Sequence, residues 1–168
     1  MNSAILFNFQ VDKENKKIKV ERSFNAQLPI IWQAWTDAKI LDQWWGPKPW
    51  KAKTVNMDFR EGGQWFYAMV GPDDAQSVWC LVDYKTIVHQ KSFAADSSFA
   101  NENKEINRSM AGSHWETEFI SQAEETLVKI YLTFDKLEDL EQYVQMGFKE
   151  GFTIGLEQLD EWLNQQKP

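Results

Sequence analysis

The stretch that decides the fold spans residues 40–47 and reads Ile40-Leu41-Asp42-Gln43-Trp44-Trp45-Gly46-Pro47. Its apolar residues share one face of a helix, and the Gly-Pro pair ends that helix. Trp44 and Trp45 lie about 100° apart on a helix, so their rings point in different directions. We expect one ring to join the core and the other to form the wall of a hydrophobic chamber, which this stretch closes at one end.

A second short helix precedes this stretch. Leu28, Ile31, Trp32 and Trp35 follow an i, i+3, i+4, i+7 spacing, which predicts a helix over residues 28–35. Asp37 then breaks that helix and caps the next one. Together these signals predict two short helices arranged in a V.

Most of the remaining chain alternates with a period of two, which is typical of strands. In residues 17–24, for example, Ile18, Val20 and Arg22 fall on one face. The predicted strands are residues 4–11, 17–24, 51–59, 64–70, 77–88, 92–95, 113–120 and 125–134. Residues 96–112 are polar and without period, which favours a mobile hairpin over a segment that covers a site.

The chain ends in one predicted long helix over residues 137–163, with apolar residues near a 3.6 period. Gly147, Gly151 and Gly155 lie inside it, each costing roughly 1 kcal/mol relative to Ala. That cost is explained if the helix lies close against a backbone or leaves space for a ligand. The predicted fold is therefore α+β of the helix-grip type: a curved antiparallel sheet with the long helix across its concave face.

Composition limits the possible partners. A length of 168 residues suits one domain over residues 1–168, and nine tryptophans with eleven phenylalanines indicate a large core, an apolar cavity, or both. The net charge of −7 argues against nucleic acid and anionic membranes as partners. No apolar run approaches the roughly 20 residues of a membrane span, so no membrane insertion is expected. Cys80 is the single cysteine, which suits a reducing, cytoplasmic location.

The motifs resemble a known family over about residues 17–163. Several segments resemble the C-terminal domain of the heat-shock-protein-90 (Hsp90) ATPase activator and its homologues, namely residues 25–26, 31–37, 44–48, 58–65, 69–73 and 150–159. The resemblance implies the START-like, or SRPBCC, superfamily, whose helix-grip members hold apolar ligands between sheet and long helix. A proline of the family pattern is displaced from Gln27 to Pro29, and another is absent at Ala38. The family has no shared catalytic constellation, so no catalytic residue is carried over.

No residue pattern specifies chemistry. His89 and His114 lack metal-ligand spacing, so a surface position is expected for both, and no metal or cofactor is predicted. Cys80 has no base beside it and is interpreted as a buried thiol. Glu116 and Glu118 share one strand face, opposite the aromatic one, and are expected outside. The basic residues 48–53 are interpreted as a solvated loop, with an anionic head group or a protein partner as the alternative.

The chamber lining is predicted from the inward aromatic positions, with Tyr67 as a polar handle. The candidate ligand-binding residues are Trp44, Trp45, Trp65, Tyr67, Met69, Trp115, Phe148 and Phe152. The alternative is that these residues are simply packed core.

Three functions are compatible with this sequence. The favoured one is non-catalytic binding of a small apolar or aromatic ligand between the sheet and the C-terminal helix. The second is a protein-interaction domain related to chaperone ATPase regulation. The third is a cyclase-like enzyme, which needs an ionisable group inside the chamber. A homodimer is expected if Phe66 or Trp79 forms an exposed aromatic patch.

Overall fold

The computed structural model describes residues 6–74 and 77–166. Within them, one antiparallel sheet has eight strands in the order β1-β2-β8-β7-β6-β5-β4-β3. The strands are β1 (Phe7–Asp12), β2 (Lys17–Phe24), β3 (Lys51–Met57), β4 (Gln64–Val70), β5 (Ser77–Val88), β6 (Ser92–Ala100), β7 (Ser113–Gln122) and β8 (Glu125–Thr133). The helices are α1 (Leu28–Thr36), α2 (Ala38–Trp44), the short 3-10 helix η1 (Pro72–Asp74), α3 (Leu137–Gln145) and α4 (Phe148–Gln166).

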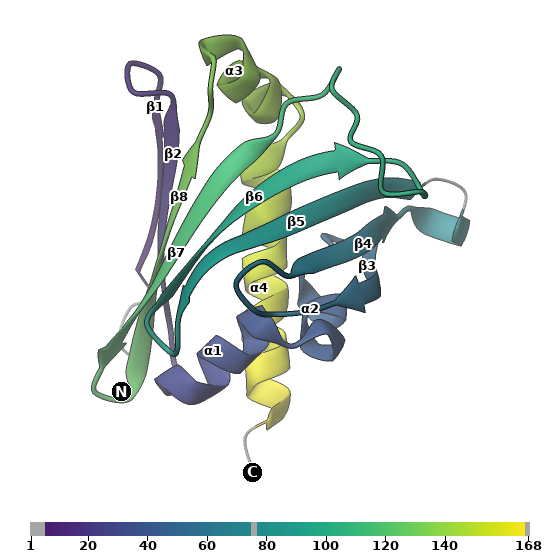
Figure 1. The fold of residues 1–168 in the computed structure, drawn as a ribbon. Helices are drawn as coiled ribbons and strands as arrows, with labels where there is room; N and C mark the ends of the chain where they lie inside the picture. The colour runs from purple at the N-terminus through teal and green to yellow at the C-terminus, as the bar shows by residue number, and fades with distance from the viewer. Residues whose placement is uncertain (1–5, 75–76, 167–168) are drawn as a thin grey trace.

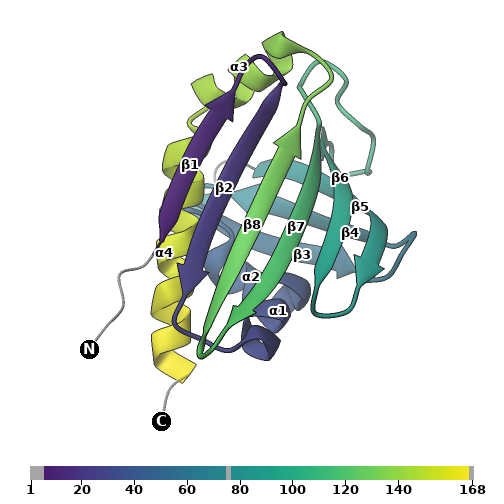
Figure 2. The same ribbon diagram turned by 90° about the vertical axis from the view of Figure 1, so that its left-hand side faces the viewer.

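The sheet curves around α4, with α1 and α2 at one end and α3 at the other (Figures 1 and 2). The core lies between the concave face and α4. Ile18, Val20 and Ile130 from the sheet are fully buried there, as is Leu159 from α4. Burial of each such side chain contributes roughly 1.5–3 kcal/mol. The predicted α+β helix-grip class is confirmed.

The two short helices form as predicted. The side chain of Asp37 accepts a hydrogen bond from the Lys39 backbone N–H at 2.9 Å, which confirms it as the N-cap of α2. The rings of Trp35 and Trp44 meet edge to face with centroids 4.7 Å apart. This contact packs α1 and α2 of the V against each other.

The prediction of one continuous C-terminal helix is wrong. The chain turns at Gly147, whose φ of +87° belongs to the left-handed region, so α3 ends at Gln145 and α4 begins at Phe148. Apolar residues continue with the same period on both sides of Gly147, so the sequence pattern does not indicate that the helix ends there. Gly155 does lie inside α4, and a Cβ there would come within 3.3 Å of the Trp44 carbonyl oxygen. The expected close approach to a backbone is confirmed at that position.

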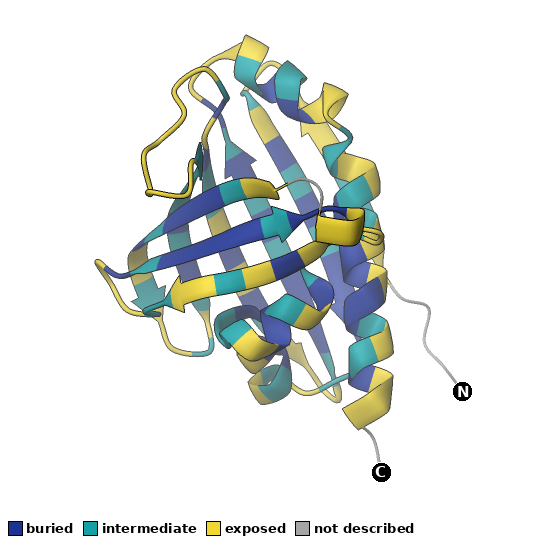
Figure 3. Ribbon diagram, turned by 90° about the vertical axis from the view of Figure 1, so that its right-hand side faces the viewer, coloured by how far each residue is buried: buried dark blue, intermediate teal, exposed yellow. Residues whose placement is uncertain are grey.

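The predicted end of the sixth strand is also wrong. β6 continues to Ala100 because it pairs with β5 over its whole length, including Leu81 with Ser98 and Trp79 with Ala100. The polar connection is therefore residues 101–112, which are largely exposed (Figure 3). At the other end of the chain, β1 begins at Phe7, and residues 4 and 5 of the predicted strand lie outside the described residues.

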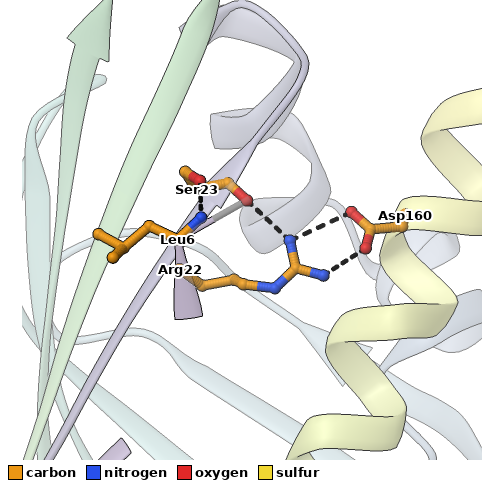
Figure 4. A network of polar contacts seen from close by, with 4 residues as sticks. All are labelled: Leu6, Arg22, Ser23 and Asp160. Atoms are coloured by element: carbon orange, nitrogen blue, oxygen red, sulfur yellow. Dashed lines mark hydrogen bonds and ion pairs between the residues drawn. The ribbon is translucent and has the colours of Figure 1, made fainter. Parts of the chain in front are cut away.

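A buried ion pair joins β2 to α4 (Figure 4). Arg22 faces inward as its strand position predicts and is 5% exposed. Its guanidinium forms a bidentate pair with the Asp160 carboxylate, and Nη1 also donates to the Ser23 carbonyl oxygen at 2.7 Å. These partners offset the desolvation of the cation, which is why an arginine can occupy a core position.

The aromatic pair on the opposite, convex face of the sheet is largely covered. Phe66 is 3% exposed and stacks on Trp79 with ring centroids 5.3 Å apart. The ammonium group of Lys104, from the connection after β6, lies 5.5 Å from the Phe66 ring centroid. Among the described residues, no helix is long and apolar enough to cross a membrane.

Candidate ligand-binding cavity

A cavity of about 350 Å³ lies between the concave face of the sheet and the start of α4. Strands β4 to β7 form its floor, α4 forms its roof, and the turn after α2 forms one side. Its lining is mostly aromatic and aliphatic. The exposed residues on the lining are Val78 and Met146, near the β4–β5 connection and the α3–α4 turn, so the mouth opens there.

Most of the predicted site residues border this cavity. They are Trp45, Trp65, Tyr67, Met69, Trp115, Phe148 and Phe152. Trp44 does not belong to the lining. Its ring is fully buried behind Trp45, and its Nε1 donates to the Ala34 carbonyl oxygen at 3.0 Å. The helical angle between the two tryptophans thus sends one ring into the core and one to the cavity wall.

Gln158 of α4 holds the turn that carries Trp45. Its Nε2 donates to the carbonyl oxygens of Trp44 at 3.0 Å and Gly46 at 2.7 Å. Its Oε1 accepts from the Lys48 backbone N–H at 3.0 Å. One buried side chain therefore satisfies the carbonyl groups that the end of α2 leaves unpaired. The wall and the roof of the cavity are joined through it.

Trp45 is the centre of the aromatic wall. Its ring centroid lies 5.7 Å from that of Trp65 and 5.9 Å from those of Trp115 and Phe152. Its Nε1 donates to the Tyr67 hydroxyl at 2.9 Å, so the polar tip of each side chain is satisfied by the other. The wall consequently presents ring faces and edges to the cavity.

The polar groups of the lining are neutral at physiological pH. Burial raises the pKa of the Cys80 thiol to about 11 and the pKa of Tyr143 to about 12. Burial also raises the pKa values of Tyr67 and Tyr84 well above their usual range. Among the described residues that border the cavity, none is an Asp, Glu, Lys, Arg or His. The site thus suits a neutral guest.

Residues 25–164 match the family described as "Activator of Hsp90 ATPase homolog 1-like protein". The match spans most of the chain and includes both helices of the V and nearly all of α4. This chain belongs to that family. The predicted family resemblance and helix-grip fold are thereby confirmed.

Solved structures extend the comparison. A protein of Arthrobacter aurescens is 26% identical with a TM-score of 0.88, covering 94% of this chain and 91% of that one. The Mycobacterium smegmatis protein Ms6760 is also 26% identical, with a TM-score of 0.86 and coverage of 95% and 97%. A Silicibacter pomeroyi protein named AHSA1 is 18% identical with a TM-score of 0.70, covering 90% and 99%, and shares the fold. No curated protein matches.

Several polar residues of the cavity lining were not predicted from the sequence. Cys80 and Tyr84 lie on the inward face of β5, and strand parity could have placed them with Val82. Thr117 shares its face with Trp115, so its position was predictable although its role was not singled out. Ser97 was missed because the predicted strand ended before it.

The other candidates lie away from the cavity. His114 is on the convex face, where its Nδ1 lies 2.6 Å from Asp96 Oδ1. Glu116 and Glu118 are exposed, as expected. His89 lies in the turn between β5 and β6, with its ring edge-on to Trp32. Among the described residues, no group of three or more His, Cys, Asp or Glu side chains could hold a metal ion.

Proposed function

We propose that this protein binds one small apolar or aromatic ligand in the cavity and does not transform it. The observation that carries the proposal is an aromatic cavity with neutral polar groups, open beside Val78 and Met146. Its volume of about 350 Å³ lies at the lower end of the range for small-molecule sites, roughly 300–1,000 Å³. A ligand of modest size fits such a site. A cytoplasmic location, inferred from the single thiol, is part of the proposal.

The chemistry of the lining supports binding over catalysis. General acid–base catalysis needs a group whose pKa lies near the working pH. The thiol of Cys80 has a pKa of about 11, so its nucleophilic form is rare at neutral pH. The carboxylates of Glu116 and Glu118 are exposed and do not border the cavity.

Two neighbouring residues of β6 offer a matched test. Ala95 borders the cavity and is 2% exposed, whereas Ala94 points to the opposite face of the sheet. Ala95→Leu would occupy the cavity, and Ala94→Leu adds the same volume elsewhere. Native mass spectrometry of the protein purified from its own cells should show a bound mass for the wild type and Ala94→Leu, but not for Ala95→Leu.

Thermal unfolding gives a second readout of the same proposal. A library of small aromatic compounds and lipids should contain ligands that raise the Tm of the wild type and Ala94→Leu, because a ligand at 100 times its Kd stabilises by about 2.7 kcal/mol. The absence of both a bound mass and any thermal shift would remove the proposal.

A protein-interaction role in chaperone regulation is the second candidate. The family description names an activator of the Hsp90 ATPase. The exposed carboxylates of Glu150, Glu157 and Glu161 along α4 offer an acidic surface for a basic partner. Addition of the purified protein to Hsp90 would raise the steady-state ATPase rate if this role holds. An unchanged rate, with no co-purifying partner, would count against it. A homodimer through Phe66 has less support because that ring is buried.

A further inference from the structure

Three hydroxyl groups on the cavity lining make no hydrogen bond within the described part of the chain, and one of them, that of Ser97, is on a residue that is only partly buried. The other two are on buried residues. They belong to Tyr84, which is 3% exposed, and Thr117, which is 2% exposed. The other tyrosines of the lining are paired, Tyr67 with Trp45 and Tyr143 with Ser113.

These two hydroxyl oxygens face the open space of the cavity. No side-chain nitrogen or oxygen that is fully enclosed lacks a partner in the described residues. The unpaired oxygens of Tyr84 and Thr117 must therefore reach accessible space, and the cavity is the space that both residues border. A hydroxyl that reaches such a space bonds to water, and an acceptor atom of a ligand can take the place of that water.

The two hydroxyl-bearing residues sit at the same end of the cavity. Phe93 is the common neighbour: its ring centroid lies 6.0 Å from that of Tyr84, and it is the cross-strand partner of Thr117. Phe93 also contacts Trp32 of α1 with centroids 6.1 Å apart. The mouth lies toward the opposite end, because Val78 is six residues before Tyr84 on β5, roughly 20 Å along the strand.

We infer that the Tyr84 and Thr117 hydroxyls receive a neutral carbonyl oxygen of the ligand, at the end of the cavity beside α1. The inference rests on the proposed function and names the class of ligand: a flat apolar molecule that carries one carbonyl group and enters with that group first. Its apolar body then lies against Trp45, Trp65 and Trp115.

The chemistry of the two groups favours a carbonyl over other oxygens. Both hydroxyls can donate, and one carbonyl oxygen has two lone pairs to accept them. A carboxylate or phosphate is disfavoured because the described lining has no cation to offset its desolvation. Burial keeps Tyr84 protonated, since it raises the pKa of its phenol well above the usual range, so the donor is always present.

The test compares 9-fluorenone with fluorene, two flat probes that differ in the carbonyl group. Kd values come from quenching of tryptophan emission, since Trp45 and Trp65 border the cavity. Wild-type protein should bind fluorenone roughly tenfold more tightly than fluorene, from two hydrogen bonds of ordinary net worth. Tyr84→Phe and Thr117→Val should each lower that ratio, and the double variant should bring it close to one.

Matched controls and a spectroscopic readout separate this role from a structural one. Tyr131→Phe and Thr133→Val remove the same groups from β8 positions that do not border the cavity, and should leave the ratio unchanged. The infrared carbonyl stretch of bound fluorenone should move to lower wavenumber in the wild type and return upward in Tyr84→Phe.

The outcomes distinguish this inference from the proposed function. Equal binding of the two probes by the wild type, or a ratio unaffected by the double variant, would overturn the carbonyl assignment alone. Tighter binding of fluorene-9-carboxylate than of fluorenone would also overturn it. Binding of neither probe would count against the carbonyl assignment and the proposed function together.

Discussion

Replacement of Gln158 by methionine should weaken the junction between α2 and α4 more than any surface change. Methionine has nearly the same length and keeps the apolar packing, but it makes no comparable hydrogen bonds. The change removes the donor to the Trp44 and Gly46 carbonyl oxygens and the acceptor for the Lys48 N–H. Trp44 and Gly46 are buried, whereas Lys48 is exposed and its N–H can bond to water.

The expected loss follows from the two enclosed carbonyl groups. Each buried polar group left without a partner costs about 1–3 kcal/mol, and the exposed Lys48 N–H adds little. Gln158→Met should therefore lower the free energy of unfolding by about 2–6 kcal/mol. The affinity for apolar ligands should fall as well, because the same turn positions the Trp45 ring.

Equilibrium unfolding in urea measures this loss directly. The transition midpoint should fall while the slope m stays constant, since the surface exposed on unfolding is unchanged. Gln166→Met is the matched control: its Nε2 donates to the Trp162 carbonyl oxygen at an exposed position, and its effect should stay within about 0.5 kcal/mol. A loss below about 0.5 kcal/mol for Gln158→Met would refute the assigned role of the side chain.

Three further predictions concern single positions. Gly151→Ala should stabilise the protein by about 0.5–1 kcal/mol in chemical denaturation. The Gly155→Ala variant should be less stable than the Gly151→Ala variant, because a Cβ at Gly155 would lie 3.3 Å from the Trp44 carbonyl oxygen. The reverse order of stability would contradict the close packing at Gly155. Cys80 should resist iodoacetamide at pH 8, where about one Cys80 thiol in a thousand is ionised, and should react faster as the pH rises toward its pKa of about 11. Mass spectrometry measures the modified fraction. Rapid modification at pH 8 would contradict the burial of Cys80. Asp160→Ala should cost about 2–4 kcal/mol in urea unfolding, because the buried Arg22 guanidinium loses its carboxylate partner. The double variant Arg22→Met with Asp160→Leu should recover most of that loss. Equal losses in the single and the double variant would exclude this cause.

The sequence predicted the strand and helix faces well because burial imposes a regular period. Residues 64–70 and 77–88 match β4 and β5 at both ends. The period could not locate the turn at Gly147, since apolar residues continue on both sides of it. A glycine within a helical pattern is equally compatible with close packing inside a helix and with a left-handed turn. Only the φ angle of Gly147, +87°, shows that this glycine forms a turn.

The cavity lining was partly predictable for a similar reason. Strand alternation marks the inward positions of β4, so Trp65, Tyr67 and Met69 could be assigned together. The pairing state of a hydroxyl is not encoded in that pattern. Tyr67 and Tyr84 both face inward, yet one is hydrogen-bonded to Trp45 and the other is unpaired in the described structure. That difference depends on residues far apart in the sequence.

The most direct test of the central claim is a calorimetric titration of the wild type, Ala94→Leu and Ala95→Leu with fluorene. Binding in the cavity predicts one fluorene per chain for the wild type and Ala94→Leu, with a negative change in heat capacity as apolar surface is buried. Ala95→Leu should show no binding, because its side chain occupies the same space. Equal binding by Ala95→Leu and the wild type, or no binding by either, would contradict the account.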